Sequence, residues 1–136
     1  MIVADATVLV KYLLREKGWQ SVSYYIRREP IYSIDHVIKE VANSIWKHCS
    51  QFKVIDQKRA FEVFYSLIKL IKAGVLILEM EEDYIEKAFS IAIENNLTFY
   101  DSLYIALALE RRACLMTCDR KQAEVSTKHG LRTIIL

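Results

Sequence analysis

The sequence has very little glycine. Only three of its 136 residues are glycine, at positions 18, 74 and 130, and each lies where a helical pattern begins or ends. None is left to build a phosphate-cradling loop of the dinucleotide-binding or Walker type. No serine lies in a Gly-x-Ser-x-Gly elbow, and no histidine stands near a cysteine at a predicted strand end. Nucleotide-dependent redox chemistry, P-loop hydrolysis and acyl transfer are therefore all disfavoured.

Long apolar runs and pairable cysteines are also lacking. The longest unbroken apolar run covers residues 103–109, far short of the roughly 20 residues that span a bilayer, and the first residues carry no basic segment typical of a secretory signal. Cysteine occurs three times, and Cys114 and Cys118 would lie about 13 Å apart along a strand, too far to bridge. We expect no membrane association and reduced, mostly buried thiols in a cytoplasmic protein.

The composition is that of one compact domain. Hydrophobic residues make up 53% of the chain and charged residues 26%, and there is a single proline. We therefore predict one domain over residues 1–136. The formal net charge of +2, from 19 basic and 17 acidic residues, is too small to indicate a nucleic-acid-binding protein by itself.

Short apolar segments alternate along the chain with segments of helical periodicity. The expected strands are residues 1–4, 31–33, 75–78, 114–118 and 133–136. The expected helices are residues 6–17, 19–28, 35–52, 56–73, 81–95, 103–112 and 120–129. This order predicts an α/β fold of three layers, α/β/α, around a short and mostly parallel central sheet.

The aspartates have two interpretations. All of the six except Asp83 lie at or near a predicted helix start, and residues 98–101 and 119–122 fit the capping-box pattern, so each aspartate alone is best read as a helix cap. However, Asp5 and Asp119 each follow a buried strand, and the carboxyl ends of parallel strands meet in one crevice. Clustered carboxylates repel one another unless a cation is present, and oxygen ligands suit Mg²⁺ or Mn²⁺ better than zinc.

Four segments carry a resemblance to a known family. They are VADATVLVK at 3–11, VIKEVANSIWK at 37–47, LTFYDSLYIALA at 97–108 and LMTCD at 115–119. In order and spacing they resemble the four acidic motifs of the PIN-domain nucleases, most closely those of the VapC-type toxins of prokaryotic toxin–antitoxin pairs. The resemblance covers the whole chain.

The resemblance implies a set of site residues. The catalytic and metal-holding quartet would be Asp5, Glu40, Asp101 and Asp119. Thr7 and Thr117 would shape the site with their hydroxyl groups, and Thr7 stands where many relatives have serine. No acidic position of the motifs is missing.

The resemblance also implies an activity and partners. The protein would be an endoribonuclease dependent on Mg²⁺ or Mn²⁺, in which a metal-activated water attacks the scissile phosphorus in line, so no histidine base is needed. RNA would be the substrate, a VapB-type antitoxin the partner, and the free protein a homodimer.

Several residues are ambiguous on physical grounds alone. Glu40 points almost opposite the apolar stripe of its predicted helix, which indicates a solvated glutamate bonded to Ser44 or Lys47. Lys11 lies one turn after Thr7 and is read equally well as a phosphate ligand or a solvated lysine. A basic rim for RNA is expected from Arg111, Arg112, Arg120, Lys121, Lys128 and Arg132, although each is equally well an ordinary surface charge.

The predicted helix 56–73 is apolar over roughly 220° of its circumference, about twice an ordinary amphipathic stripe. Either a neighbouring helix covers the second side or another chain does, and the resemblance favours a homodimer contact and an antitoxin wrapped around these helices.

Two rivals to the nuclease remain. A phosphatase of the aspartyl-nucleophile type also places an aspartate after its first strand, but it needs a second aspartate two residues later, where Thr7 stands. A binding module that keeps the fold without cleaving, such as an RNA-processing subunit, is the other alternative.

Overall fold

A five-stranded parallel sheet forms the centre of the computed structural model, which describes residues 1–136. The strand order is β3-β2-β1-β4-β5, and every neighbouring pair runs parallel. The strands are β1 (Ile2–Ala4), β2 (Ile31–Ile34), β3 (Leu76–Glu79), β4 (Cys114–Thr117) and β5 (Thr133–Ile135). The expectation of a mostly parallel sheet is confirmed, since no antiparallel pair occurs.

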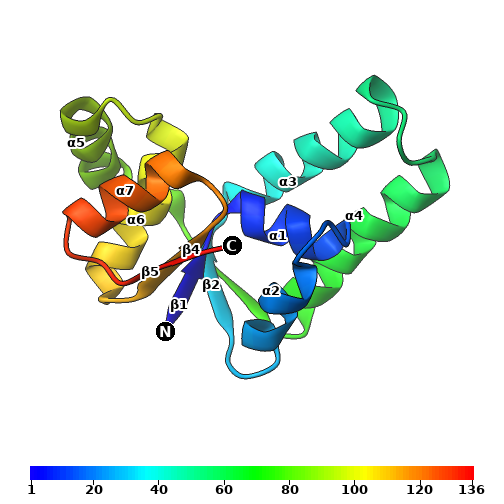
Figure 1. Ribbon diagram of the computed structural model, residues 1–136, viewed down its shortest axis with the longest axis horizontal. Helices are drawn as coiled ribbons and strands as arrows, with labels where there is room; N and C mark the ends of the chain where they lie inside the picture. The colour runs from blue at the N-terminus through cyan, green and yellow to red at the C-terminus, as the bar shows by residue number, and fades with distance from the viewer.

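Helices cover both faces of this sheet. They are α1 (Ala6–Leu13), α2 (Trp19–Ile26), α3 (Val37–Trp46), α4 (Gln57–Lys72), α5 (Ile85–Asn95), α6 (Phe99–Arg111) and α7 (Arg120–Lys128). A π-helical turn, η1 (Lys47–Gln51), follows α3, and a 3₁₀ turn, η2 (Glu81–Asp83), precedes α5. Helices α1 to α4 lie on one side of the sheet and α5 to α7 on the other (Figure 1). The predicted three-layer α/β/α architecture is confirmed.

Local polar contacts explain where the element boundaries differ from the prediction. Helix α6 begins four residues earlier than expected, because the hydroxyl of Thr98 accepts a hydrogen bond from the Asp101 N–H at 3.2 Å and caps the helix. The expected cap at Asp35 is wrong for α3. Its carboxylate instead accepts from the N–H of Glu81 at 3.0 Å and so joins η2 to the end of β2.

Helix α6 explains the longest apolar run of the sequence. Every residue from Ser102 to Ala108 is buried, because α6 crosses the strands β1, β2 and β4 while α5 packs along it. The run is thus a helix enclosed by the core on nearly all sides. No helix of the structure combines the length and the apolar character needed to span a membrane.

The sheet has a topological switch point between β1 and β4. The chain adds β2 and β3 on one side of β1, then crosses the sheet and adds β4 and β5 on the other side. Ala4 pairs with Met116, and the Asp5 N–H donates to the Met116 carbonyl at 3.3 Å. Ligands bind outside the carboxyl ends of strands at such a point in α/β folds. Asp5 and Thr117 therefore stand side by side where a ligand is expected.

The three cysteines are free thiols, as predicted, but Cys49, Cys114 and Cys118 are only half-buried. The expectation that they are mostly buried is wrong. Cys114 begins β4 and Cys118 follows its last residue, whereas Cys49 lies in the middle of η1.

Candidate functional site

Asp5 is the most deeply buried carboxylate at the switch point, with 2% of the residue exposed. It caps α1: Oδ1 accepts from the Val8 N–H at 3.1 Å and from the Thr7 hydroxyl at 2.6 Å. Oδ2 lies 2.5 Å from the hydroxyl of Thr117. Burial raises the pKa of Asp5 to about 6, although these hydrogen bonds favour the charged form. The Asp5 side chain therefore caps α1, and its burial disfavours the charged form of the carboxylate.

Thr117 connects Asp5 to the rest of the site. Its hydroxyl accepts from the Asp119 N–H at 2.9 Å and lies 2.7 Å from Oε1 of the buried Gln122. The Gln122 Nε2 in turn donates to the Asp101 carbonyl at 2.9 Å, which fixes the orientation of the amide. A hydroxyl carries one proton, so Thr117 cannot donate to Asp5 and Gln122 at once. Both oxygens facing Thr117 are satisfied only when the Asp5 carboxyl is protonated and donates to Thr117, or when a cation binds the Asp5 carboxylate.

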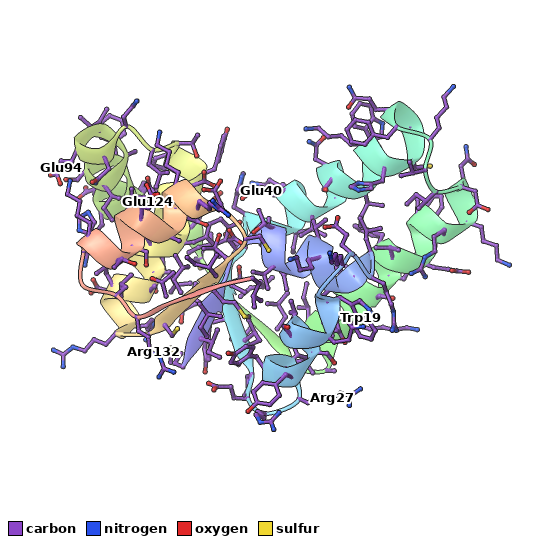
Figure 2. The ribbon with its side chains drawn as sticks, in the orientation of Figure 1. Trp19, Arg27, Glu40, Glu94, Glu124 and Arg132 are labelled. Atoms are coloured by element: carbon purple, nitrogen blue, oxygen red, sulfur yellow. The ribbon has the colours of Figure 1, made fainter.

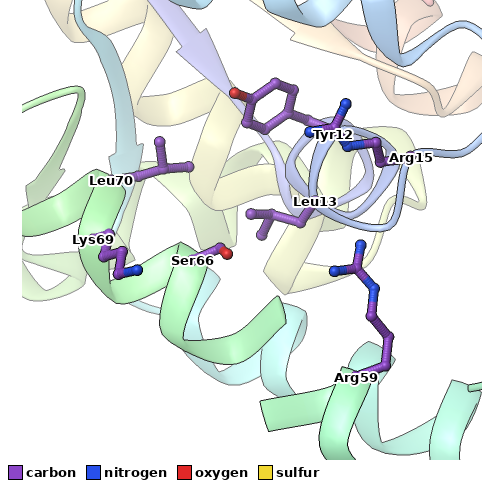
Figure 3. A pocket seen from close by; sticks show the side chains of 7 residues that line it. All are labelled: Tyr12, Leu13, Arg15, Arg59, Ser66, Lys69 and Leu70. Atoms are coloured by element: carbon purple, nitrogen blue, oxygen red, sulfur yellow. The ribbon is translucent and has the colours of Figure 1, made fainter. Parts of the chain in front are cut away.

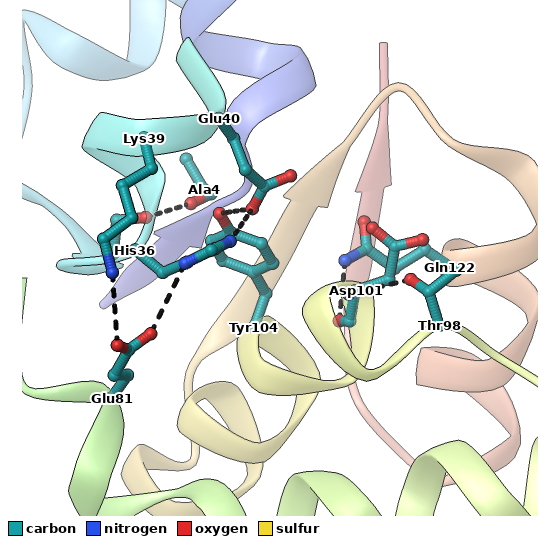
Figure 4. Close-up of polar contacts among 10 residues, drawn as sticks. Ala4, His36, Lys39, Glu40, Glu81, Thr98, Asp101, Tyr104 and Gln122 are labelled. Carbon is teal, nitrogen blue, oxygen red and sulfur yellow. Dashed lines mark hydrogen bonds and ion pairs between the residues drawn. The ribbon is translucent and has the colours of Figure 1, made fainter. Parts of the chain in front are cut away.

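Glu40 lies on the side of α3 that faces α6. The hydroxyl of Tyr104 donates to its Oε1 at 2.5 Å, and the imidazole Nε2 of His36 lies 3.8 Å from the same oxygen (Figure 4). Burial raises the pKa of Glu40, and the charge of Asp101 adds to the effect. The interpretation of Glu40 as a solvated glutamate bonded to Ser44 or Lys47 is wrong, since its partner is the buried Tyr104.

His36 is fixed from three directions. Its ring stacks on Tyr100 with the centroids 4.7 Å apart, and its Nδ1 lies 3.5 Å from Glu81. Together with the contact to Glu40, this holds the start of α3 against the start of α6.

Asp101 and Asp119 complete the group of acidic residues. Asp101 is the third residue of α6 and is half-buried, and both burial and the charge of Asp119 raise its pKa. Asp119 caps α7, accepting from the Gln122 N–H at 2.8 Å. The charge of Asp101 also raises the pKa values of Asp5 and Glu40. The four carboxylates thus act on one another electrostatically, although they come from four separate segments.

A cavity of about 340 Å³ lies beside Glu40, the one carboxylate of the four that lines it. Its lining includes Thr7, Lys11, Glu16, Glu40, Ser44 and His48. The Thr7 hydroxyl also accepts from the Cys118 N–H at 3.0 Å, which ties this wall to the end of β4. Thr7 and Lys11 therefore both lie beside this cavity, and Figure 2 places Glu40 between the helices of the two faces.

A second cavity of about 290 Å³ lies between α1 and α4, outside the carboxylate group. Its polar side chains are Tyr12, Arg15, Arg59, Ser66 and Lys69 (Figure 3). No carboxylate lines it.

The carboxylate oxygens are ligands of the kind that a hard divalent cation prefers, but they are not arranged as a metal site in this structure. No three histidine, cysteine, aspartate or glutamate side chains stand in an arrangement that could hold a metal ion. The available ligands are carboxylate oxygens that raise one another's pKa, and this is the environment a cation relieves.

The expected basic rim does not form. Arg132 precedes β5 and lies with Arg27 at the amino end of the sheet, away from Glu40 (Figure 2). Arg111 ends α6 and pairs with Glu79 at 2.7 Å. Of the six basic residues named from the sequence, only Arg120 and Lys121 begin a helix at the carboxyl edge.

Two site residues escaped the sequence reasoning. Tyr104 is hidden inside an apolar run, and Gln122 fits a capping box in which it would bond the Asp119 N–H. In the structure the Asp119 N–H donates to the Thr117 hydroxyl instead. A hydroxyl within an otherwise aliphatic helix is the sequence signal that could have indicated Tyr104, whereas the burial of Gln122 is visible only in the structure.

Comparison with known proteins gives a consistent result. Ribonuclease VapC3 of Pyrobaculum aerophilum is 28% identical over 124 residues, which are 90% of this chain and 92% of that protein. The crystal structure of PAE2754 from the same organism superposes with a TM-score of 0.73 at 20% identity, covering 98% of this chain and 83% of that one. VapBC2 from Rickettsia felis, bound to a DNA fragment from its promoter, gives a TM-score of 0.61 at 16% identity, covering 100% and 99%. The sequence profile of the PIN domain matches residues 2–128, so this chain belongs to the PIN domain family.

Proposed function

We propose that this chain is an endoribonuclease dependent on Mg²⁺ or Mn²⁺ and the toxin of a VapBC-type toxin–antitoxin pair. The observation that carries the proposal is the gathering of Asp5, Glu40, Asp101 and Asp119 at the switch point, where each carboxylate lies within electrostatic reach of another. The relative named Ribonuclease VapC3, which matches over nearly its full length, supports RNA as the substrate.

The four carboxylates would hold the cation, which supplies activation of water at neutral pH and neutralisation of charge at the scissile phosphate. The other side chains position these ligands. Thr7 and Thr117 hold the two oxygens of Asp5, and Tyr104 holds Glu40. Such partners orient ligands and commonly contribute ten- to a hundredfold to metal affinity or activity, as an order of magnitude. Lys11 supplies a positive charge for an RNA phosphate beside Thr7.

An experiment with two substrates separates this proposal from its rivals. Purified protein is titrated with Mn²⁺ in the presence of either single-stranded RNA or an aryl phosphate monoester. The proposal predicts RNA cleavage that requires the metal and no hydrolysis of the monoester. Hydrolysis of the monoester alone would favour the phosphatase, and RNA binding without cleavage at any metal concentration would favour the binding module.

Helix α4 is the proposed contact surface for the antitoxin and for a second copy of the chain. Val63 and Leu67 face the core, whereas Phe61 and Tyr65 are 60% and 57% exposed. The two exposed rings lie 6.2 Å apart. The wide apolar stripe predicted from the sequence thus has one buried and one uncovered side. The likeness to the VapBC2 complex supports an antitoxin as one occupant of the uncovered side.

We expect Phe61→Glu and Tyr65→Glu each to weaken antitoxin binding, or self-association, by at least about tenfold, because exposed aromatics dominate interface energetics. Calorimetry with the antitoxin and sedimentation of the free protein measure the two effects. Gln57→Glu, on the exposed start of the same helix, is the matched control and should change neither. Unchanged affinity and unchanged mass in both aromatic variants would mean that α4 is not an interface.

A further inference from the structure

The cavity beside Glu40 has both an apolar and a polar lining. Ala6 and Val10 form its apolar wall, and polar groups of α1, α3 and η1 surround the opening. Its volume, about 340 Å³, is within the range of small-ligand pockets. Because Glu40 and Thr7 belong both to the cavity and to the proposed carboxylate site, a ligand bound in the cavity would lie beside that site.

The hydrogen bond of His48 fixes which ring nitrogen faces the ligand. His48 Nδ1 lies 2.7 Å from the carbonyl oxygen of Ser44. A carbonyl only accepts, so Nδ1 carries the proton, and in the neutral ring Nε2 is an acceptor. This Nε2 lies 3.8 Å from the carboxylate of Glu16, which is too far for a hydrogen bond. Two acceptors 3.8 Å apart therefore line the cavity, whose lining also holds the ammonium of Lys11.

The backbone that carries His48 is itself unusual. His48 lies in the π-helical turn η1, which is closed by a hydrogen bond from the Phe52 N–H to the Lys47 carbonyl at 2.7 Å. π-helical turns are rare in proteins. Those that do occur are often found at functional sites, because they redirect one side chain out of the α-helical repeat. Here the redirected imidazole forms a wall of the cavity.

We propose that this cavity binds the base of a nucleotide next to the scissile phosphate, and that Glu16 and His48 select a base with an exocyclic amino group over uracil. The proposal rests on the proposed ribonuclease function. An amino group has two N–H donors and can serve both acceptors, as adenine, cytosine and guanine can. Uracil presents carbonyl oxygens at its exocyclic positions, which Glu16 and Nε2 would repel.

The first test is the base preference of cleavage. Short single-stranded RNAs that differ only in the two nucleotides flanking the cleaved bond are compared in single-turnover reactions at one Mn²⁺ concentration. We expect roughly tenfold slower cleavage when uridine occupies one of these positions, because a site with unpaired acceptors rejects a base without matching donors. In Glu16→Gln, the amide can donate to a uracil carbonyl, and the penalty should fall to within about twofold. Glu62→Gln on exposed α4 is the matched control and should keep the wild-type preference.

The second test does not depend on cleavage. Cytidine and uridine 5′-monophosphate differ by an amino group in place of a carbonyl, and each is titrated into isotope-labelled protein while the ring signals of His48 are followed. We expect the cytidine nucleotide alone to shift these signals in the wild type, and both to do so in Glu16→Gln.

These results distinguish failure of the inference from failure of the proposed function. Selective shifts by cytidine nucleotide without cleavage of any RNA would support the base site and reject the ribonuclease. The inference would be overturned if RNAs with uridine at either position were cleaved as fast as those without it. Equal shifts by the two nucleotides in the wild type would also overturn it.

Discussion

We expect Asp5→Asn and Asp101→Asn each to lower the proposed Mn²⁺-dependent RNA cleavage by at least about a hundredfold, since a lost ligand should cost no less than a lost outer partner of a metal site. The fold should persist. The asparagine oxygen at position 5 can still accept from the Val8 N–H, and its amide nitrogen can donate to Thr117, which then donates to Gln122. Initial rates and circular dichroism measure the two effects.

The matched control is Asp56→Asn. Asp56 also caps a helix, accepting from the Arg59 N–H at 2.8 Å, but it is exposed at the start of α4 and outside the carboxylate group. Its substitution should leave the cleavage rate unchanged. If Asp5→Asn and Asp101→Asn cleave as fast as the Asp56 variant, the switch-point aspartates are helix caps and nothing more.

The second large effect is a pH-dependent stability penalty from Asp5 in the metal-free protein. The folded pKa of about 6 lies above the ordinary value of 3.8, so the folded state holds its proton more tightly than the unfolded state does. Below about pH 4 both states are protonated and no penalty exists; above about pH 6 both are ionised and the penalty is complete. A shift of about two units corresponds to roughly 3 kcal/mol, so unfolding becomes easier by about that amount as the pH rises.

Asp5→Asn isolates this term because asparagine does not titrate. In urea unfolding with a chelator present, we expect the variant to gain roughly 3 kcal/mol relative to the wild type between about pH 4 and pH 7. Added Mn²⁺ should then stabilise the wild type by mass action and leave the variant unaffected. If the difference in unfolding free energy between the two proteins stays constant with pH, burial does not raise the pKa of Asp5.

The sequence allowed the strand ends to be placed, and with them Asp5 and Asp119. Buried parallel strands are continuous apolar runs, and the first polar residue after each run marks the carboxyl edge of the sheet. The role of Glu40 could not be obtained this way. Helical periodicity shows only which side of α3 faces its own core, whereas the partner Tyr104 is 64 positions away in the sequence. The family motif, rather than periodicity, indicated that position.

The prediction of a basic rim was wrong for a related reason. Residues that are close in the C-terminal quarter of the sequence are divided between the two ends of the sheet, because α6 and α7 run antiparallel to the strands. Arg120 thus starts α7 at the carboxyl edge, whereas Lys128 ends it at the other. Proximity in sequence predicts a shared surface only within one helix face or one sheet edge.

A crystal soaked in Mn²⁺ would show whether the switch-point carboxylates hold a divalent cation. Anomalous scattering locates manganese without reference to activity. We predict a peak within ligating distance of Asp5 and Asp101, with the Glu40 or Asp119 carboxylate turned toward it, and no such peak in Asp5→Asn crystals. A wild-type crystal at saturating Mn²⁺ with no peak between these carboxylates, or with manganese bound only elsewhere, would mean that they do not form a metal site.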